Sequence, residues 1–275
     1  MKAAPAAKLP PDKQRELTLA ITRLERQSFV ARLAQATGTP VDLMIKYLPN
    51  AVNARLRDLI KATIVKCLEA AIDSLDEDHE VGVADEWLGK LMTGIAGGVG
   101  GFFGMAALPF ELPLTTTLML RSIAEIARAE GENVRSPQTM LACLEVFALG
   151  GGRGEQNELK LEYYAVRTVL TKFTQDVGRY TMQRGAINAS SPIIARLVGE
   201  IVSRFGLALS DRFATGVVPV VGALSGATVN MIFMEHFQRV AHGHFVVRRL
   251  EREFGAEIIR HHYRVAASAM NGRRH

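Results

Sequence analysis

The stretch GGVGGFFGMAALPFELPLTTTLML, residues 97–120, is apolar and rich in glycine, and Glu111 is its only charged residue. Four glycines in and just before it recur at steps of three and four residues: Gly94, Gly97, Gly101 and Gly104. This spacing places them on one face of an α-helix. Glycine costs about 1 kcal/mol relative to alanine inside a helix. Four on one face therefore favour close contact with a second helix, as in a glycine zipper.

A second stretch, FATGVVPVVGALSGATVNMIFM at residues 213–234, is also uncharged. It carries Gly222 and Gly226 in GxxxG spacing, followed by Asn230. Residues 91–110 and 213–234 are both long enough for a helix that crosses a bilayer, so an integral membrane protein with two spans is one interpretation.

The first stretch leads through Pro109, Glu111 and Pro113 into another apolar segment, which is typical of a bent hairpin. Both stretches also contain polar residues, Thr93 and Thr215 among them. We therefore favour buried central helices or a hairpin that dips into a membrane, because helices in a protein core are also apolar on all sides.

The segments around these stretches have the period of amphipathic helices. In residues 163–180 and 194–205, apolar residues follow one another at steps of three and four. Ser136-Pro137 and Ser191-Pro192 pair a capping hydroxyl with a proline suited to the first helical position. Period-2 alternation is almost absent. The sequence predicts an all-α fold.

Several local features bear on the division of the chain into domains. Gly131 and Gly255 follow helical patterns and are predicted helix ends. The longest polar break is GGGRGEQNE at residues 150–158, and nothing beside it resembles a domain boundary. We expect a disordered lead-in at residues 1–11, a helical arm at 12–49 and a single helical domain at 50–270.

Composition indicates a globular chain with a substantial core. The 275 residues are 48% hydrophobic, and the two cysteines, Cys67 and Cys143, both lie in helical patterns. This usage favours reduced thiols in the cytoplasm. The first residues carry no continuous apolar run of the kind found in a signal peptide.

The net charge of +5 arises entirely in the C-terminal segment. Residues 239–275 contain eight arginines and three glutamates, whereas residues 1–238 are neutral overall. A localised basic surface suits an anionic partner such as lipid headgroups. The candidate anion-binding residues are Arg248, Arg249, Arg252, Arg260 and Arg264. The alternative is an ordinary solvated helix surface, and nucleic-acid binding is disfavoured because no recognised module accompanies the arginines.

Candidates for chemistry are few. A carboxylate in apolar surroundings either pairs with a cation or has a raised pKa, so Glu111 with His236 or His244 is the weak catalytic candidate. His236, His242 and His244 are weak candidates for metal ligands, but no HExxH or CxxC pattern accompanies them. No phosphate-loop, dinucleotide or nucleophile-elbow motif occurs, so the sequence predicts no cofactor.

Four segments carry a resemblance to the EcsC family: residues 102–132, VFALGG at 146–151, VPVVGALSGATVN at 218–230 and HFQRVAHGHFVVRRLERE at 236–253. The resemblance spans about residues 50–264. The matching motif positions are Pro109, Glu111, Pro113, Arg121, Gly222, Gly226, Asn230, His236, Phe237, His242, His244, Arg248 and Arg249. The family takes its name from a protein encoded beside a bacterial ABC transporter. The resemblance implies a mostly helical, intracellular protein associated with membrane transport, and it implies no catalytic residues.

Two classes of function follow from these observations. The first is a non-enzymatic accessory protein at the cytoplasmic face of the inner membrane, whose partner is an anionic membrane surface or a membrane protein, with an apolar small molecule or lipid as a possible ligand. The second is a hydrolase-type enzyme that uses Glu111 with His236 or His244 in an apolar pocket. The sequence does not predict an oligomeric state.

Overall fold

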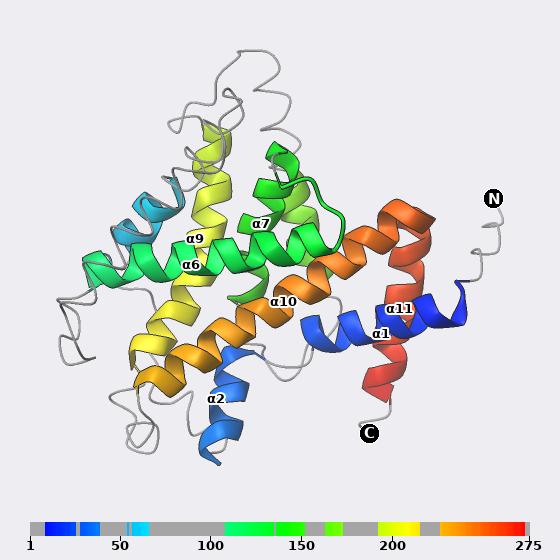
Figure 1. Ribbon diagram of the computed structural model, residues 1–275, viewed down its shortest axis with the longest axis horizontal. Helices are drawn as coiled ribbons and strands as arrows, with labels where there is room; N and C mark the ends of the chain where they lie inside the picture. Colours follow the sequence, from blue (N-terminus) through cyan, green and yellow to red (C-terminus); the bar gives the residue numbers. More distant parts are fainter. Residues whose placement is uncertain are drawn as a thin grey trace.

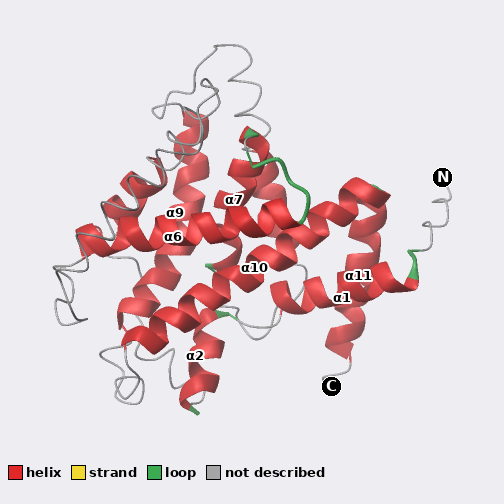
Figure 2. Cartoon of the chain, in the orientation of Figure 1, coloured by secondary structure: helices red, strands yellow, loops and turns green. Residues whose placement is uncertain are grey.

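The computed structural model describes residues 9–25, 28–38, 54, 57–65, 108–134, 136–151, 163–172, 192–214 and 226–272. The labelled helices are α1 (Pro11–Glu25), α2 (Phe29–Thr37), α6 (Leu108–Ala129), α7 (Pro137–Gly150), α9 (Pro192–Ala214), α10 (Gly226–Phe254) and α11 (Ala256–Gly272). Residues 57–65 and 163–172 are helical as well. Helices and short connections make up all of the described chain, with no strand (Figure 2). The prediction of an all-α fold is confirmed.

The helix boundaries follow the local signals in the sequence. Ser136 caps α7 by accepting a hydrogen bond from the backbone N–H of Thr139, and Pro137 occupies the first turn. Gly131 and Gly255 adopt left-handed backbone angles, with φ of 77° and 93°, directly after α6 and α10. Glycine adopts this conformation without steric cost, so both predicted helix ends are confirmed.

The long helix α10 is the centre of the fold (Figure 1). It packs against α1, α2, α6, α7, α9 and α11. Its N-terminal half contributes Phe233 and Phe237 to the main core, where they meet Phe147 of α7 and Phe205 of α9 in tilted and edge-to-face contacts. Such aromatic clusters remove large apolar areas from water and stabilise the packing of the three helices.

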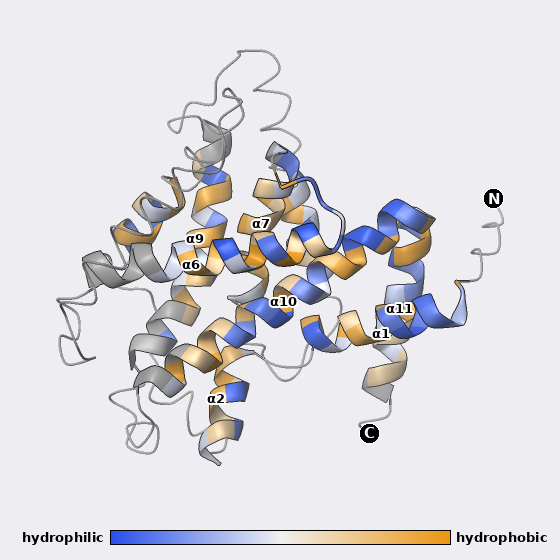
Figure 3. Cartoon of the chain, viewed as in Figure 1, coloured by the Kyte–Doolittle hydropathy of each residue, from blue (hydrophilic) through white to orange (hydrophobic). Residues whose placement is uncertain are grey.

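A second, smaller core lies around the C-terminal half of α10. Here α1 and α11 pack against α10 and against each other. Leu17 and Ile21 of α1 and Tyr263 of α11 belong to this core, and all three are fully buried. Hydrophilic residues dominate the last turns of α10 and the first turns of α1 on the outer surface (Figure 3). The N- and C-terminal helices therefore form one packing unit.

Close helix contacts in the described chain involve glycines outside the predicted stripe. A Cβ on Gly151 would lie 2.3 Å from the backbone carbonyl of Arg204 in α9. A Cβ on Gly243 of α10 would lie 3.0 Å from the carbonyl oxygen of Ala20 in α1. The first distance is shorter than real Cβ contacts and the second is tighter than most of them, so the glycines permit α7 to approach α9 and α10 to approach α1.

Several predicted structural positions lie outside the described residues. These are the predicted glycine zipper, with Gly94, Gly97, Gly101 and Gly104, and Gly222 of the GxxxG pair in the second uncharged stretch. Pro109 and Pro113 belong to the first turns of α6, and Gly226 and Asn230 belong to the first turns of α10.

Candidate functional site: a buried polar network on α10

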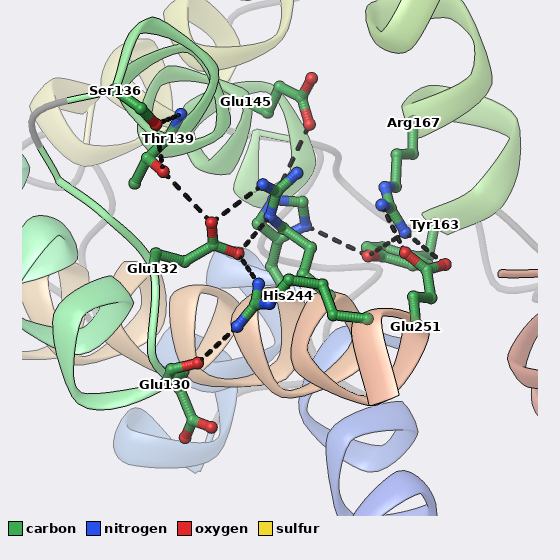
Figure 4. Close-up of polar contacts among 11 residues, drawn as sticks. Glu130, Glu132, Ser136, Thr139, Glu145, Tyr163, Arg167, His244 and Glu251 are labelled. Carbon is green, nitrogen blue, oxygen red and sulfur yellow. Dashed lines mark hydrogen bonds and ion pairs between the residues drawn. The ribbon is translucent and has the colours of Figure 1, made fainter. Parts of the chain in front are cut away.

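A polar network lies between the C-terminal half of α10, helix 163–172, α7 and the connection from α6 to α7 (Figure 4). It runs from Glu145 of α7 through His244 of α10 and Tyr163 to Arg167 and Glu251. These side chains occur at widely separated sequence positions, and the packing of the other three elements around α10 brings them together.

The strongest contact in the network joins Arg167 to Glu251. The guanidinium donates two hydrogen bonds to the carboxylate, of 2.8 Å and 2.6 Å. Both side chains are largely buried, with 15% and 11% of their surface exposed. The Tyr164 hydroxyl donates a further hydrogen bond of 2.9 Å to the same carboxylate. Bidentate geometry of this kind fixes the angle between helix 163–172 and α10.

His244 is completely buried and has two polar neighbours. Its Nδ1 lies 3.1 Å from the hydroxyl of Tyr163, which also accepts a hydrogen bond from Arg167. The hydroxyl keeps its own proton free for Nδ1, and we assign the tautomer in which Nδ1 accepts that proton. The remaining proton of a neutral imidazole then lies on Nε2, which faces Oε2 of Glu145 at 3.7 Å.

Burial determines the ionisation of the groups in this network. It lowers the pKa of His244 well below 6.5, and the positive charges of Arg167 and Arg248 lower it further. Burial also raises the pKa of Glu145 from 4.5 to about 7, although the same two arginines oppose the rise. The pKa of the Tyr163 hydroxyl is raised by burial above its ordinary value of 10. A neutral imidazole and an un-ionised phenol are therefore favoured.

Glu132 organises the other side of the network. Its carboxylate accepts hydrogen bonds of 2.8 Å and 3.1 Å from Arg248, pairs with Arg252 and accepts a bond from Thr139. Burial alone would raise the pKa of Glu132, but the hydrogen bonds and positive charges of Arg248 and Arg252 outweigh burial and lower it. This carboxylate connects the start of α7 to the end of α10.

The structure gives internal partners to the arginines predicted to bind anions. Arg248 and Arg252 share Glu132, and Arg249 pairs with Glu16 of α1 at 2.7 Å and with Glu130 at 3.0 Å. Acidic side chains of the same chain thus face three of the five predicted anion ligands. We therefore expect the replacement of these three arginines to affect stability as well as charge.

The remaining two predicted anion ligands lie on α11. Arg260 lies over the ring of Tyr164, with its guanidinium carbon 5.3 Å from the ring centroid, and it also faces Glu257 at 3.6 Å. Arg264 is exposed. An isolated exposed cation is an ordinary surface feature and does not by itself form an anion site.

The three histidines considered as metal ligands have different environments. His236 is buried, and its Nε2 donates a 2.8 Å hydrogen bond to the carbonyl oxygen of Gly150. Burial lowers the pKa of His236 to about 4. His242 is only partly buried, and His244 belongs to the network above. In the part of the chain that the structure describes, no three histidine, cysteine or acidic side chains converge as a metal site would require.

Of the proposed catalytic pair, only the histidine side chains lie among the described residues. Glu111 belongs to the first turn of α6, and its side chain lies outside the described residues. The two histidines have the contacts given above, His236 with a backbone carbonyl and His244 with Tyr163 and Glu145.

Most residues of the network carry no motif that marks them in the sequence. They are Glu132, Glu145, Tyr163, Arg167 and Glu251. One signal was available: Glu145 is the only charged residue of α7, in the otherwise apolar run LACLEVFALG. A lone carboxylate on an apolar helix indicates a buried partner, but the sequence does not say which residue that partner is.

Chemically, the network is suited to holding helices in place. Arginine–carboxylate pairs, tyrosine hydroxyls and a neutral histidine satisfy one another across four elements. The exception is the contact between Glu145 and His244. Their facing atoms, Oε2 and Nε2, are both buried and without a hydrogen-bond partner among the described residues.

The comparisons with known proteins identify the family. The model of the EcsC protein family matches residues 12–250, from the first turn of α1 to the last turns of α10. The match therefore begins well before residue 50, where the resemblance in the sequence was placed. No curated protein and no solved structure matches the chain. Among the helices that the structure describes, none combines the length and apolar character needed to cross a membrane. The chain belongs to the EcsC family.

Proposed function

We propose that this protein is a non-enzymatic accessory protein at the cytoplasmic face of the inner membrane, where it binds lipid or a membrane protein in transport or secretion. The observation that carries the proposal is the position of the helix ends that border the two uncharged stretches. The first residues of α6 and α10 and the last residues of α9 all lie at one end of the longest axis, at the left in Figure 1.

Both uncharged stretches join the fold at these helix ends. Residues 91–110 run into α6 at Leu108, and residues 213–234 connect the last residues of α9 to α10. One end of the molecule therefore carries the attachment points of the two most apolar stretches in the sequence. Uncharged apolar segments favour the headgroup and acyl boundary of a bilayer over water.

The arginines predicted to bind lipid lie near the opposite end of α10. This helix contains 29 residues, which corresponds to a length of about 43 Å. Arg248 and Arg252 lie in its last two turns and pair with Glu132. We call the end of the molecule where the two uncharged stretches attach the apolar end. The positions of these helix ends favour membrane contact through the apolar end, with little contribution from the paired arginines.

The polar network favours a binding protein over a hydrolase. His236 and His244, the histidines of the enzyme alternative, are completely buried and make structural contacts with Gly150 and Tyr163. A lowered pKa makes a histidine a weaker base at neutral pH, and burial separates it from a substrate in solution.

Flotation with lipid vesicles tests the proposed membrane contact. We expect the full chain to float with vesicles of mixed neutral and anionic lipid and to stay bound in high salt, because salt does not weaken apolar insertion. The double variant Phe102→Glu/Val220→Glu places one carboxylate in each uncharged stretch. It should reduce binding at least about tenfold, since a carboxylate in hydrocarbon costs roughly 2–3 kcal/mol.

A matched control uses the same chemical change at the other end of the molecule. Leu19 of α1 and Val265 of α11 are apolar and exposed, with 60% and 56% of their surface accessible. Leu19→Glu/Val265→Glu should leave vesicle binding unchanged. If this control lost binding, or if salt released the wild-type protein completely, contact through the apolar end would be wrong. Absence of binding to every vesicle would exclude the lipid part of the proposal.

A further inference from the structure

The contact between Glu145 and His244 is unlike the rest of the network. Oε2 of Glu145 and Nε2 of His244 face each other at 3.7 Å, with 4% and 0% of the two side chains exposed. Neither atom has a hydrogen-bond partner among the described residues, whereas the neighbouring polar groups are bonded. Two ionisable groups buried this closely influence each other's proton occupancy.

Charged neighbours act on this pair from two elements. Arg167 comes from helix 163–172, and Arg248 and Glu251 come from α10 itself. The other titratable groups nearby are Tyr163, bonded to His244; Tyr263 of α11, stacked on Tyr163; Cys143, on the same helix as Glu145; and Glu132, which Arg248 neutralises.

The proton content of the pair follows from these surroundings. If both groups were protonated, His244 would be a buried cation next to Arg167 and Arg248, which is unfavourable. Loss of the carboxyl proton would leave a buried charge on Glu145, whose Oε2 has no hydrogen-bond partner among the described residues, and desolvation opposes this state. In the favoured folded state, the imidazole of His244 is therefore neutral and the carboxyl group of Glu145 is protonated.

We propose that Glu145 and His244 form a one-proton pair, in which folding moves a proton from the imidazole to the carboxyl group. In the unfolded chain at pH 5.5, the glutamate is ionised and the histidine is protonated. In the folded chain, the Nδ1–H bond of the imidazolium is broken, Nδ1 accepts a hydrogen bond from Tyr163, and an O–H bond forms on Glu145. The number of bound protons does not change.

Because of this exchange, the pH dependences that the two groups give to the folding stability oppose each other. The pKa of Glu145 is raised from 4.5 to about 7, so its contribution to stability is complete below pH 4.5 and is lost as the pH rises through 7. The pKa of His244 is lowered, so its contribution is complete above pH 6.5 and is lost as the pH falls below that value. Between pH 4.5 and 6.5 the two trends are opposite and cancel.

Single variants should therefore show opposite pH dependence. Glu145→Gln removes the carboxyl proton, and His244→Asn keeps an acceptor near the position of Nδ1 for the Tyr163 hydroxyl. We measure the folding equilibrium constant by urea unfolding between pH 4.5 and 6.5, and we compare each protein with the double variant Glu145→Gln/His244→Asn. The quantity compared is the folding equilibrium constant of each protein divided by that of the double variant. For E145Q this ratio should fall about tenfold for each pH unit of acidification, and for H244N it should fall about tenfold for each unit of alkalinisation.

The wild-type protein should show almost no change in this ratio over the same range. Equal slopes in the two single variants, or a wild-type slope equal to that of E145Q, would overturn the one-proton pair. The measurement is made without membranes and is independent of the proposed membrane contact.

Spectroscopy of the wild-type chain gives a second test that does not require the variants to fold. The ring nitrogens of His244 should keep neutral chemical shifts from pH 4.5 to 8 in a nitrogen NMR titration. The infrared spectrum should contain a carboxylic-acid C=O band that disappears as the pH rises through about 7. Titration of His244 near pH 6.5 in the folded protein, or absence of that band at pH 5.5, would overturn the proposal.

Discussion

Gly151→Ala is expected to destabilise the protein by roughly 3 kcal/mol, because the added methyl group has no room between α7 and α9. Its Cβ would lie 2.3 Å from the carbonyl carbon and oxygen of Arg204 and 2.7 Å from the backbone nitrogen of Phe205. Backbone atoms within a helix cannot rotate away as a side chain can. The two helices must therefore separate, and the aromatic contact of Phe147 with Phe205 weakens with them.

Thermal unfolding measures this effect, and a second glycine in α9 gives the control. In a chain of this length, each kcal/mol corresponds to about 2–4 °C in the melting temperature. Gly199 is exposed, and a Cβ added there meets nothing within 4 Å. Gly199→Ala should stabilise the helix by up to about 1 kcal/mol. The two variants should change the melting temperature in opposite directions, which distinguishes close packing from a general effect of replacing glycine. A melting temperature unchanged by Gly151→Ala would contradict the packing of α7 against α9.

The second large effect is expected for Glu251→Ala, at about 3 kcal/mol or more. Removal of this carboxylate leaves the Arg167 guanidinium largely buried without its partner and deprives the Tyr164 hydroxyl of its acceptor. An unpaired buried charge costs more than the pair contributes when it is intact. Chemical denaturation should therefore show a large loss for the single variant.

Replacement of both partners distinguishes this explanation from a loss of packing. The double variant Arg167→Met/Glu251→Leu removes both charges, so most of the stability should return. Glu125→Ala is the surface control: its carboxylate lies 3.4 Å from Arg121 and the two side chains are more than half exposed. We expect it to change stability by less than about 1 kcal/mol. If the double variant lost as much stability as Glu251→Ala, the penalty of the unpaired guanidinium would be the wrong explanation.

Local features of the fold could be predicted from the sequence because their causes are local. The periodicity around Tyr163, Val166 and Leu170 predicts the described part of a helix. The serine and proline at residues 136–137 predict the start of α7, and Gly131 and Gly255 predict the ends of α6 and α10. Each of these signals acts within a few residues of the structure that it determines.

The polar network could not be predicted in the same way. The partners Arg167 and Glu251 are 84 residues apart, and Arg248 and Glu132 are 116 apart. Helical periodicity shows which face of a helix is buried, but it does not show which helix covers that face. The basic excess after residue 238 was visible, whereas its neutralisation by acids of α1 and of the connection before α7 depends on packing.

The polar break at residues 150–158 shows how composition alone can mislead. Three consecutive glycines followed by charged residues are typical of an exposed connection. The first two of these glycines are buried in the structure, where Gly150 meets Phe237 and Gly151 meets the backbone of α9. Glycine serves flexible connections and tight contacts equally well, and only the neighbouring helix distinguishes the two roles.

The pairing of α1 with α11 has a consequence for the order in which the protein forms on the ribosome. Residues of α1 are bound by residues that are synthesised much later: Glu16 meets Arg249, 233 positions later, and Glu25 accepts a hydrogen bond from Tyr263, 238 positions later. A nascent chain thus carries the apolar face of α1, with Leu17 and Ile21, through the synthesis of more than two hundred further residues before α11 exists to cover it. Closure of this unit is among the latest and slowest steps of folding, since contacts between distant parts of the chain must overcome the largest loss of chain entropy. Until then, the apolar face of α1 is exposed and can be bound by a chaperone.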